Sequence, residues 1–169
     1  AEAHEALVKK MVGRYSDSGQ AASLERTAKS YFAAPIDPVS PLSKRVQEMA
    51  HRSVEIADGY HEWMALCAGM AEYRMGNLVE ANRLLGEALN SPHNECAVLA
   101  LPYLAMALHQ GGEKTAALGR LRNAEDAIAP FLAEIDSAEG STVWHDRAFA
   151  ILALKEARAM ILDSKPAAP

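Results

Sequence analysis

Apolar side chains recur every three or four positions along most of the chain, and clusters of turn-forming residues interrupt them. Trp63, Leu66, Met70 and Tyr73 show this spacing, which places them on one face of an α-helix. Glycine, proline and small polar residues mark the breaks between such segments. The pattern predicts helices over about 3–15, 24–32, 42–54, 60–75, 78–89, 94–110, 113–135 and 142–162.

Proline and capping residues refine several of these boundaries. Three prolines fall between positions 35 and 41 and exclude a continuous helix between the second and third segments. Pro102 lies inside the sixth segment, where we expect a kink or a delayed helix start. Asn77, with Glu80 three positions later, predicts a capping pair at the start of the fifth helix.

The composition supports an all-α fold. The 169 residues include 33 Ala and 18 Leu but only 8 Val and 6 Ile, so strong helix formers outnumber the residues that favour strands. A chain of this length can form one domain with a core of its own. We therefore expect a single helical domain over residues 1–164 and a frayed tail over residues 165–169.

Charge and cysteine usage limit the classes of function. With 17 Lys and Arg against 22 Asp and Glu, the net charge is −5, whereas nucleic-acid binding needs a basic stripe. No apolar run comes near the length of a membrane span, about 20 residues, so we expect neither a signal peptide nor membrane insertion. Cys67 and Cys96 lie in apolar helical segments, so we expect buried free thiols in a cytoplasmic protein. Because the chain begins at Ala1 and not at a methionine, we expect a fragment or a processed chain.

The middle of the chain repeats itself after a shift of 36 positions. In each copy a small residue lets two helices approach closely, a glycine forms the turn between them, and an Ala–Leu–Ala series lines the inner face of the second helix. Such helix pairs bury their apolar faces by stacking on neighbouring pairs. The first copy contains Gly69, Gly76, Ala81, Leu85 and Ala88, and the second contains Ala105, Gly112, Ala117, Leu121 and Ala124.

This pattern resembles the tetratricopeptide repeat (TPR), a helix–turn–helix unit of about 34 residues. Tyr73 and, less closely, Trp63 supply the aromatic character of the repeat in the first copy. A divergent third copy precedes it, with Val46, Ala50 and Ser53 at 35 positions before the Ala–Leu–Ala series. The resemblance implies a right-handed stack of helical hairpins, a TPR-like α–α superhelix. Its repeats would cover about 22–57, 60–91 and 94–135, with a capping helix over 142–162.

A narrower resemblance rests on the order of several short motifs. They are Leu24 to Lys29, Gly69 to Gly76, Glu80-Ala81, Leu104 to His109, Trp144 to Asp146 and Glu156-Ala157. In this order they are similar to the repeat region that follows the catalytic domain in some bacterial eukaryotic-like serine/threonine protein kinases. The sequence lacks the Gly-rich loop, the His-Arg-Asp motif and the Asp-Phe-Gly motif of the kinase domain itself. The resemblance therefore implies a non-catalytic appendage of a larger signalling protein.

The resemblance also implies a binding groove, which TPR domains line with the first helix of each pair. The candidate residues here are Trp63, Leu66, Met70, Tyr73, Arg74, Met106, His109 and Gln110. Packed core is an equal alternative for Leu66 and Met70, whereas Tyr73, Arg74 and His109 have polar tips that suit a wet groove. Chaperone-binding members clamp a carboxylate with Lys and Asn on this face, and the apolar residues of this chain depart from that pattern. We expect a protein or peptide partner of apolar or mixed character, from the same chain or from another.

The sequence contains no motif that indicates a catalytic or a metal site. The six histidines show no metal-ligand spacing, so we expect no metal and no cofactor. His145 and Asp146 are adjacent, and neighbours on a helix point about 100° apart, so we do not expect them to meet as a catalytic pair. The run from Gly111 to Thr115 lacks the upstream glycine and the strand of a phosphate-binding loop.

Two other functions stay open. One is a structural spacer or a self-association domain, with a homodimer as its simplest form. The other is a small-molecule sensor pocket between the helices near Trp63 and Trp144.

Overall fold

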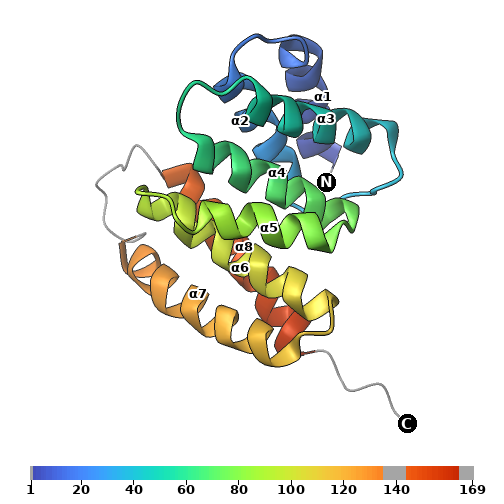
Figure 1. The fold of residues 1–169 in the computed structure, drawn as a ribbon. Coiled ribbons are helices and arrows are strands. Elements are labelled where there is room, and N and C mark those ends of the chain that lie inside the picture. Colours follow the sequence, from blue (N-terminus) through green and yellow to red (C-terminus); the bar gives the residue numbers. More distant parts are fainter. Residues whose placement is uncertain (1, 135–143, 164–169) are drawn as a thin grey trace.

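The computed structural model describes residues 2–134 and 144–163, which form eight α-helices (Figure 1). They are α1 (Glu2–Tyr15), α2 (Ala21–Phe32), α3 (Pro41–Glu55), α4 (His61–Met75), α5 (Leu78–Ala88), α6 (Asn94–Gln110), α7 (Lys114–Glu134) and α8 (Trp144–Leu162). The described residues contain no strand, so the predicted all-α fold with about eight helices is confirmed. The helix ends agree with the pattern to within three residues. The predicted tail over 165–169 lies outside the described residues.

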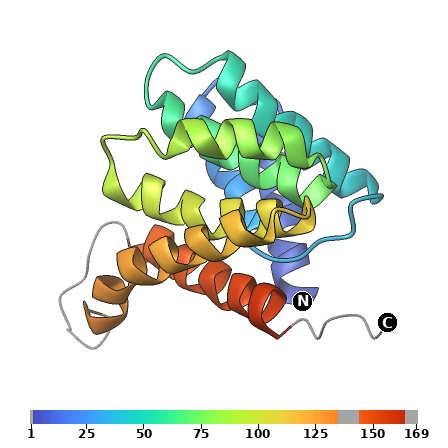
Figure 2. The same cartoon turned by 60° about the horizontal axis from the view of Figure 1, so that its bottom comes forward.

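The helices form an inner and an outer layer. In the inner layer α2 contacts α4, α4 contacts α6, and α6 contacts α8, while α3, α5 and α7 each pack outside the helix that precedes them (Figures 1 and 2). α1 packs on α2. Contacts between α2 and α4 keep a constant separation of 42 positions, from Cys67 to Glu25 and from Arg74 to Phe32. The two helices therefore run in the same direction.

The turns after α4 and α6 have the same backbone geometry. Gly76 and Gly112 both have φ of +85°, in the left-handed region that glycine adopts without strain. After each of them, the next backbone N–H reaches back to close the helix end, from Asn77 to the Glu72 carbonyl at 2.9 Å and from Glu113 to the Leu108 carbonyl at 2.9 Å. The shift of 36 positions that relates the sequences therefore also relates these two turns.

Gly69 of α4 lies in close contact with Leu85 of α5. A Cβ atom at this position would lie 2.8 Å from Leu85 Cγ and 3.1 Å from the Leu85 backbone nitrogen. Both distances are shorter than ordinary van der Waals contact, and Leu85 is fully buried. The absence of a side chain at Gly69 is therefore required for this helix pair to pack as it does.

Small residues fill the interface between the layers. The Ala and Leu residues of the 36-position repeat are all buried: Ala81, Leu85, Ala88, Ala105, Ala117, Leu121 and Ala124. Val46, Ala50 and Ser53 of the proposed earlier copy are buried as well. Together with larger side chains they belong to one continuous core that extends from Val8 to Ile161.

Two local expectations are corrected. The delayed start considered for the sixth helix is wrong, because α6 begins at Asn94 and continues through Pro102, which is buried. Asn77 makes no side-chain cap, because its amide nitrogen donates instead to Glu72 Oε2 at 2.5 Å, while Glu80 pairs with Arg83.

By contrast, Cys67 and Cys96 are free and buried as expected. None of the helices in the described ranges combines the length and the apolar character that crossing a bilayer requires.

Candidate functional site

The predicted groove residues divide between the core, the two ends of α4 and the end of α6. Leu66, Met70 and Met106 are fully buried, so the core alternative holds for Leu66 and Met70. Trp63 is half-buried at the start of α4, and Tyr73 and Arg74 lie at its end. Among the remaining candidates, His109 is half-buried and Gln110 is exposed at the end of α6. The predicted residues therefore do not line one continuous groove.

Arg74 is the centre of a polar cluster at the C-terminal ends of the inner helices. Its guanidinium forms a two-pronged ion pair with Glu156 of α8, with Nη2 at 2.6 Å from Oε2 and Nη1 bonded to Oε1. Its Nε donates to the backbone oxygen of Phe32 on α2 at 3.1 Å. The Arg74 side chain is only 5% exposed. A single buried cation thus connects α2, α4 and α8.

Two tyrosines enclose this guanidinium. The rings of Tyr73 and Tyr103 pack edge to face with centroids 5.8 Å apart, and the guanidinium carbon of Arg74 lies 5.3 Å and 5.4 Å from their centroids. Burial raises the pKa of Tyr103 to about 12, so its hydroxyl stays protonated and donates to the Phe32 carbonyl at 3.1 Å. Desolvation likewise raises the pKa of Tyr73. Tyr73 and Arg74 therefore have internal structural contacts in addition to any role at the surface.

A small pocket of about 240 Å³ opens above this cluster. The Nε2 of Gln110 donates to the Tyr73 hydroxyl at 3.3 Å at its edge, and the same hydroxyl donates to the sulfur of Met160 at 3.9 Å. The other lining residues come from the proline-rich loop, the end of α4 and α8: Pro35, Ile36, Pro38, Arg74, Met75, Gly76 and Glu156. Three of the eight predicted groove residues, Tyr73, Arg74 and Gln110, meet here.

A second buried cation is Lys29, in the last turn of α2, and its ammonium lies near residues at the starts of α4 and α8. Its Nζ is 2.7 Å from Glu25 Oε1 on the same helix and 2.8 Å from Asp146 Oδ1 on α8. All three residues are 4% exposed. The ammonium also lies 4.5 Å from the centroid of the Trp63 ring, within range of a cation–π interaction.

Two carboxylates share the one ammonium. Desolvation raises the pKa of Glu25 against the opposing effect of Lys29. Desolvation lowers the pKa of Lys29, but the two carboxylates outweigh it and the net shift is upward. Lys29 is therefore held as an ammonium, and its role is to pair with Glu25 and Asp146 rather than to act as a nucleophile.

A pocket of about 400 Å³ opens beside this triad, between the starts of α4 and α8. Trp63, Tyr60 and His145 supply rings to its wall. Tyr60 has φ of +55°, in the left-handed region that is strained for a bulky side chain, and its ring lies against His93 with centroids 5.4 Å apart. The expectation that His145 and Asp146 do not meet is wrong, because Nε2 of His145 lies 3.1 Å from Oδ2 of Asp146. The short aspartate side chain bends back toward its neighbour while its other oxygen faces Lys29.

A third cluster surrounds the buried carboxylate of Glu72 between α3, α4 and α5. It accepts hydrogen bonds from Gln47 at 2.7 Å, from His51 at 2.5 Å and from Asn77 at 2.5 Å. The hydrogen bond with Glu72 raises the pKa of His51. Burial alone would raise the pKa of Glu72, but the three donors outweigh it and lower that pKa.

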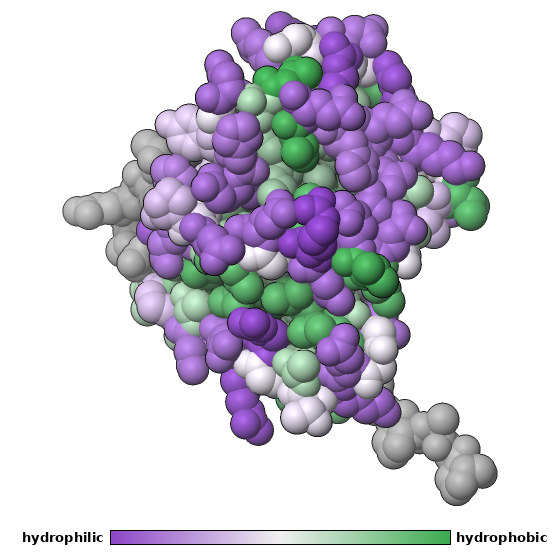
Figure 3. Space-filling view, viewed as in Figure 1, coloured by the Kyte–Doolittle hydropathy of each residue, from purple (hydrophilic) through white to green (hydrophobic). Residues whose placement is uncertain are grey.

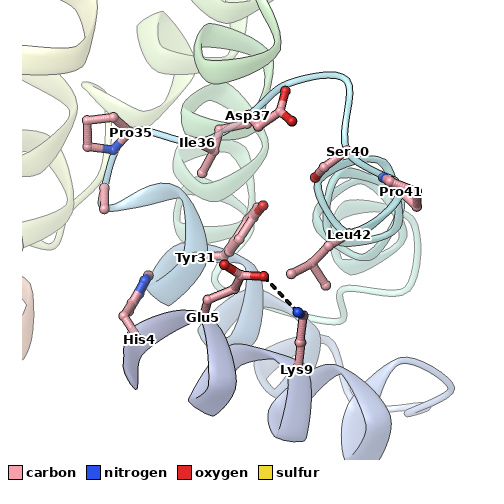
Figure 4. Close-up of a pocket in the computed structure, with 11 residues that line it drawn as sticks. His4, Glu5, Lys9, Tyr31, Pro35, Ile36, Asp37, Ser40, Pro41 and Leu42 are labelled. Atoms are coloured by element: carbon pink, nitrogen blue, oxygen red, sulfur yellow. Dashed lines mark ion pairs between the residues drawn. The ribbon is translucent and has the colours of Figure 1, made fainter. Parts of the chain in front are cut away.

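The pocket of about 710 Å³ at the N-terminal end contains none of the predicted site residues (Figure 4). It lies between α1, the end of α2, the proline-rich loop and the start of α3. Tyr31, Ile36 and Leu42 point into it, and the ion pair of Glu5 with Lys9 at 2.7 Å lies on its α1 side (Figure 4). Its charged groups are exposed, in contrast to those around Lys29 and Arg74.

The outer surface is mixed in character. In the view of Figure 3, polar side chains dominate the face over α3 to α5, and apolar side chains gather between α5 and α7. Val79 of α5 is 88% exposed and Leu118 of α7 is 38% exposed.

Sequence reasoning missed Glu25, Lys29 and Glu156, which complete the two ionic centres. A signal was present for the first two, because Glu25 and Lys29 are four positions apart within the apolar stripe of α2. Glu156 gave no such signal, since its partner lies 82 positions away.

Within residues 2–134 and 144–163, no three His, Cys, Asp or Glu side chains converge as a metal site would require. No family model matches the chain, and neither the curated proteins nor the solved structures contain a significant match.

Proposed function

We propose that this chain is a non-catalytic protein-interaction module of TPR type, an appendage of a larger bacterial signalling protein such as a serine/threonine kinase. The module would bind a protein or peptide segment on the inner layer of helices. The observation that carries the proposal is the construction of that layer, in which parallel helices present two buried cations and two pockets toward a further helix. The matching turns at Gly76 and Gly112 support the repeat interpretation.

The rim residues of the predicted set are the ones that suit direct contact with a partner. Gln110 is exposed, and Trp63 and His109 are half-buried. The fully buried residues of the set act through packing instead. Tyr73 and Arg74 contribute to both, because they line the pocket above the Arg74 cluster but also make internal hydrogen bonds.

A display selection on the intact chain tests this function. Peptides are selected from a random library on the immobilised protein, and their affinities are measured for wild type, Gln110→Ala and Asn90→Ala. Both positions are exposed at helix ends, but Asn90 lies after α5, away from the inner pockets. We expect Gln110→Ala to weaken binding about tenfold through lost contacts at the pocket, and Asn90→Ala to leave it unchanged. No enrichment of peptides, or equal binding by both variants, would contradict the proposal.

A second candidate function is a small-molecule sensor, and the pocket beside Trp63 specifically favours it. Aromatic walls with a few buried charged groups are typical of ligand sites. The protein has only two tryptophans, and Trp144 is 67% exposed. Trp144→Phe therefore leaves Trp63 as the sole tryptophan reporter. A metabolite panel that includes organic amines should shift Trp63 emission if this function holds, and a panel without any shift would speak against it.

A further inference from the structure

The last helix supplies the counter-ions for both buried cations of the inner layer. Asp146 in the first turn of α8 pairs with Lys29, and Glu156 pairs with Arg74. We propose that the inner face of α2, α4 and α6 is a receptor for a helix that carries two carboxylates on its buried side, with α8 as its resident occupant. A partner helix of the same chemistry would compete with α8 for this face. The inference rests on the proposed interaction function and assigns the kind of partner.

The burial of the two cations is the first argument. The side chains of Lys29 and Arg74 are each only 5% exposed. Within the described residues, Glu156 is the only acidic side chain that forms an ion pair with Arg74. Without a helix in the place of α8, this guanidinium would lose its counter-ion. Any occupant of the face must therefore bring a carboxylate to it.

The spacing on α8 is the second argument. Asp146 and Glu156 are ten positions apart, which corresponds to about 15 Å along a helix and about 80° around it. This offset lets one carboxylate reach α2 and the other reach α4. Between them, α8 buries the small and apolar side chains of Ala150, Ala153 and Leu154, and Ala157 is buried directly after Glu156. The recognised helix is thus defined by two carboxylates at this spacing and by alanines that allow close packing.

One outer ion pair of α8 is exposed, which is the third argument, whereas a second pair, between Arg147 and Glu95 of α6 at 3.4 Å, is only 23% and 21% exposed. Arg158 pairs with Glu125 of α7 at 2.7 Å, and its side chain is 58% exposed. Exposed pairs of this kind contribute little to stability and are screened by salt. Buried ion pairs such as that of Arg74 add little net stability when complete, because the cost of desolvation offsets much of their attraction. A competing helix that forms the same two buried ion pairs can therefore replace α8 if its other side chains pack better against the receptor face.

The test uses a fluorescein-labelled peptide with the sequence of residues 144–162, titrated with the intact 169-residue chain and followed by anisotropy. Three chains are compared: wild type, Glu156→Gln and the matched control Lys155→Gln. Lys155 is exposed on the same helix, so its replacement should leave the docking of α8 unchanged. We expect the peptide to bind the Glu156→Gln chain at least about tenfold more tightly than the other two, because its resident helix is weakened while the receptor residues are intact. A peptide in which both carboxylates are changed to amides should bind at least about tenfold more weakly.

Equal binding of the unmodified and the amide peptides would overturn the inference, and so would a lack of binding to the Glu156→Gln chain. Circular dichroism and amide exchange establish whether that variant stays folded. If it does not, Asp146→Asn takes its place with the same expectation, because it weakens the other buried pair. The failure of this inference is distinct from failure of the proposed function. Library peptides that bind through Gln110 without competing with the residue 144–162 peptide would support the module but contradict the role of α8.

Discussion

Replacement of Gly69 by alanine tests the close packing of α4 against α5. The new Cβ would lie 2.8 Å from Leu85 Cγ, 3.0 Å from Leu85 Cδ2 and 3.1 Å from the Leu85 backbone nitrogen. A rotation of the leucine side chain cannot relieve the last of these contacts, since it involves the backbone. Leu85 is also fully buried, so the two helices must move apart.

Two opposing effects determine the change in unfolding free energy. Alanine in a helix interior is favoured over glycine by about 1 kcal/mol. Overpacking of a well-filled interface costs about 1–3 kcal/mol. Since the overlap includes a backbone atom, we expect the upper part of that range and a net loss of about 1–2 kcal/mol.

Gly86→Ala is the matched control on the facing helix. Gly86 lies in the interior of α5, and a Cβ there would meet no atom within 4 Å. The unfolding free energy of the Gly86→Ala variant should therefore rise by up to about 1 kcal/mol. Urea denaturation of wild type and the two variants gives both changes directly. If Gly69→Ala is as stable as Gly86→Ala, the close approach described here is wrong.

Three further predictions concern the polar clusters and a turn. Glu156→Gln should lower the unfolding free energy by about 2–3 kcal/mol in urea denaturation, because it leaves Arg74 buried without a counter-ion. A loss below about 0.5 kcal/mol would show that the pair contributes no more than an ordinary surface ion pair. His51→Gln should destabilise more at low pH than at high pH, since the pKa of His51 is raised in the fold. The contribution of His51 to the unfolding free energy is fully present below its ordinary pKa of 6.5 and is lost as pH rises through the raised pKa. A difference in unfolding free energy that does not change between pH 5.5 and 8.5 would therefore contradict the pairing of His51 with Glu72. Gly112→Ala should lower the unfolding free energy by about 1 kcal/mol, because φ is +85° at this position. Thermal denaturation measures the change, and an unchanged melting temperature would contradict that backbone geometry.

Local pattern was sufficient to predict the helices. Each helix is defined by side chains three or four positions apart and by nearby breakers, and both signals are contained within a few residues. Pro102 shows where such signals fail. Its missing N–H predicted a kink or a delayed helix start, but α6 begins at Asn94 and continues past the buried proline to Gln110.

The 36-position repeat also predicted part of the tertiary structure. Gly69 and Gly76 were assigned to close approach and to a turn from their spacing, and the structure gives them those roles. The roles of the two glycines could be predicted because a pattern that recurs after 36 positions indicates a repeated structural unit, and the unit defines how its two helices pack.

The candidate site was predictable only in part. Arg74 was expected to face a partner, and it does contact an acidic side chain, but that side chain belongs to α8 of the same chain. Pairings of this kind depend on how distant helices are placed relative to one another, which periodicity does not encode. The contact of His145 with Asp146 was missed for a related reason, since backbone spacing alone does not determine where a short side chain bends.

Amide hydrogen exchange of the intact chain, with and without a saturating selected peptide, tests the central claim that the inner layer binds a protein segment. The account predicts added protection at the ends of α4 and α6, around Tyr73 and Gln110, together with a change in the exchange of α8. Protection confined to the outer helices α3, α5 and α7, or no protection at saturation, would contradict it.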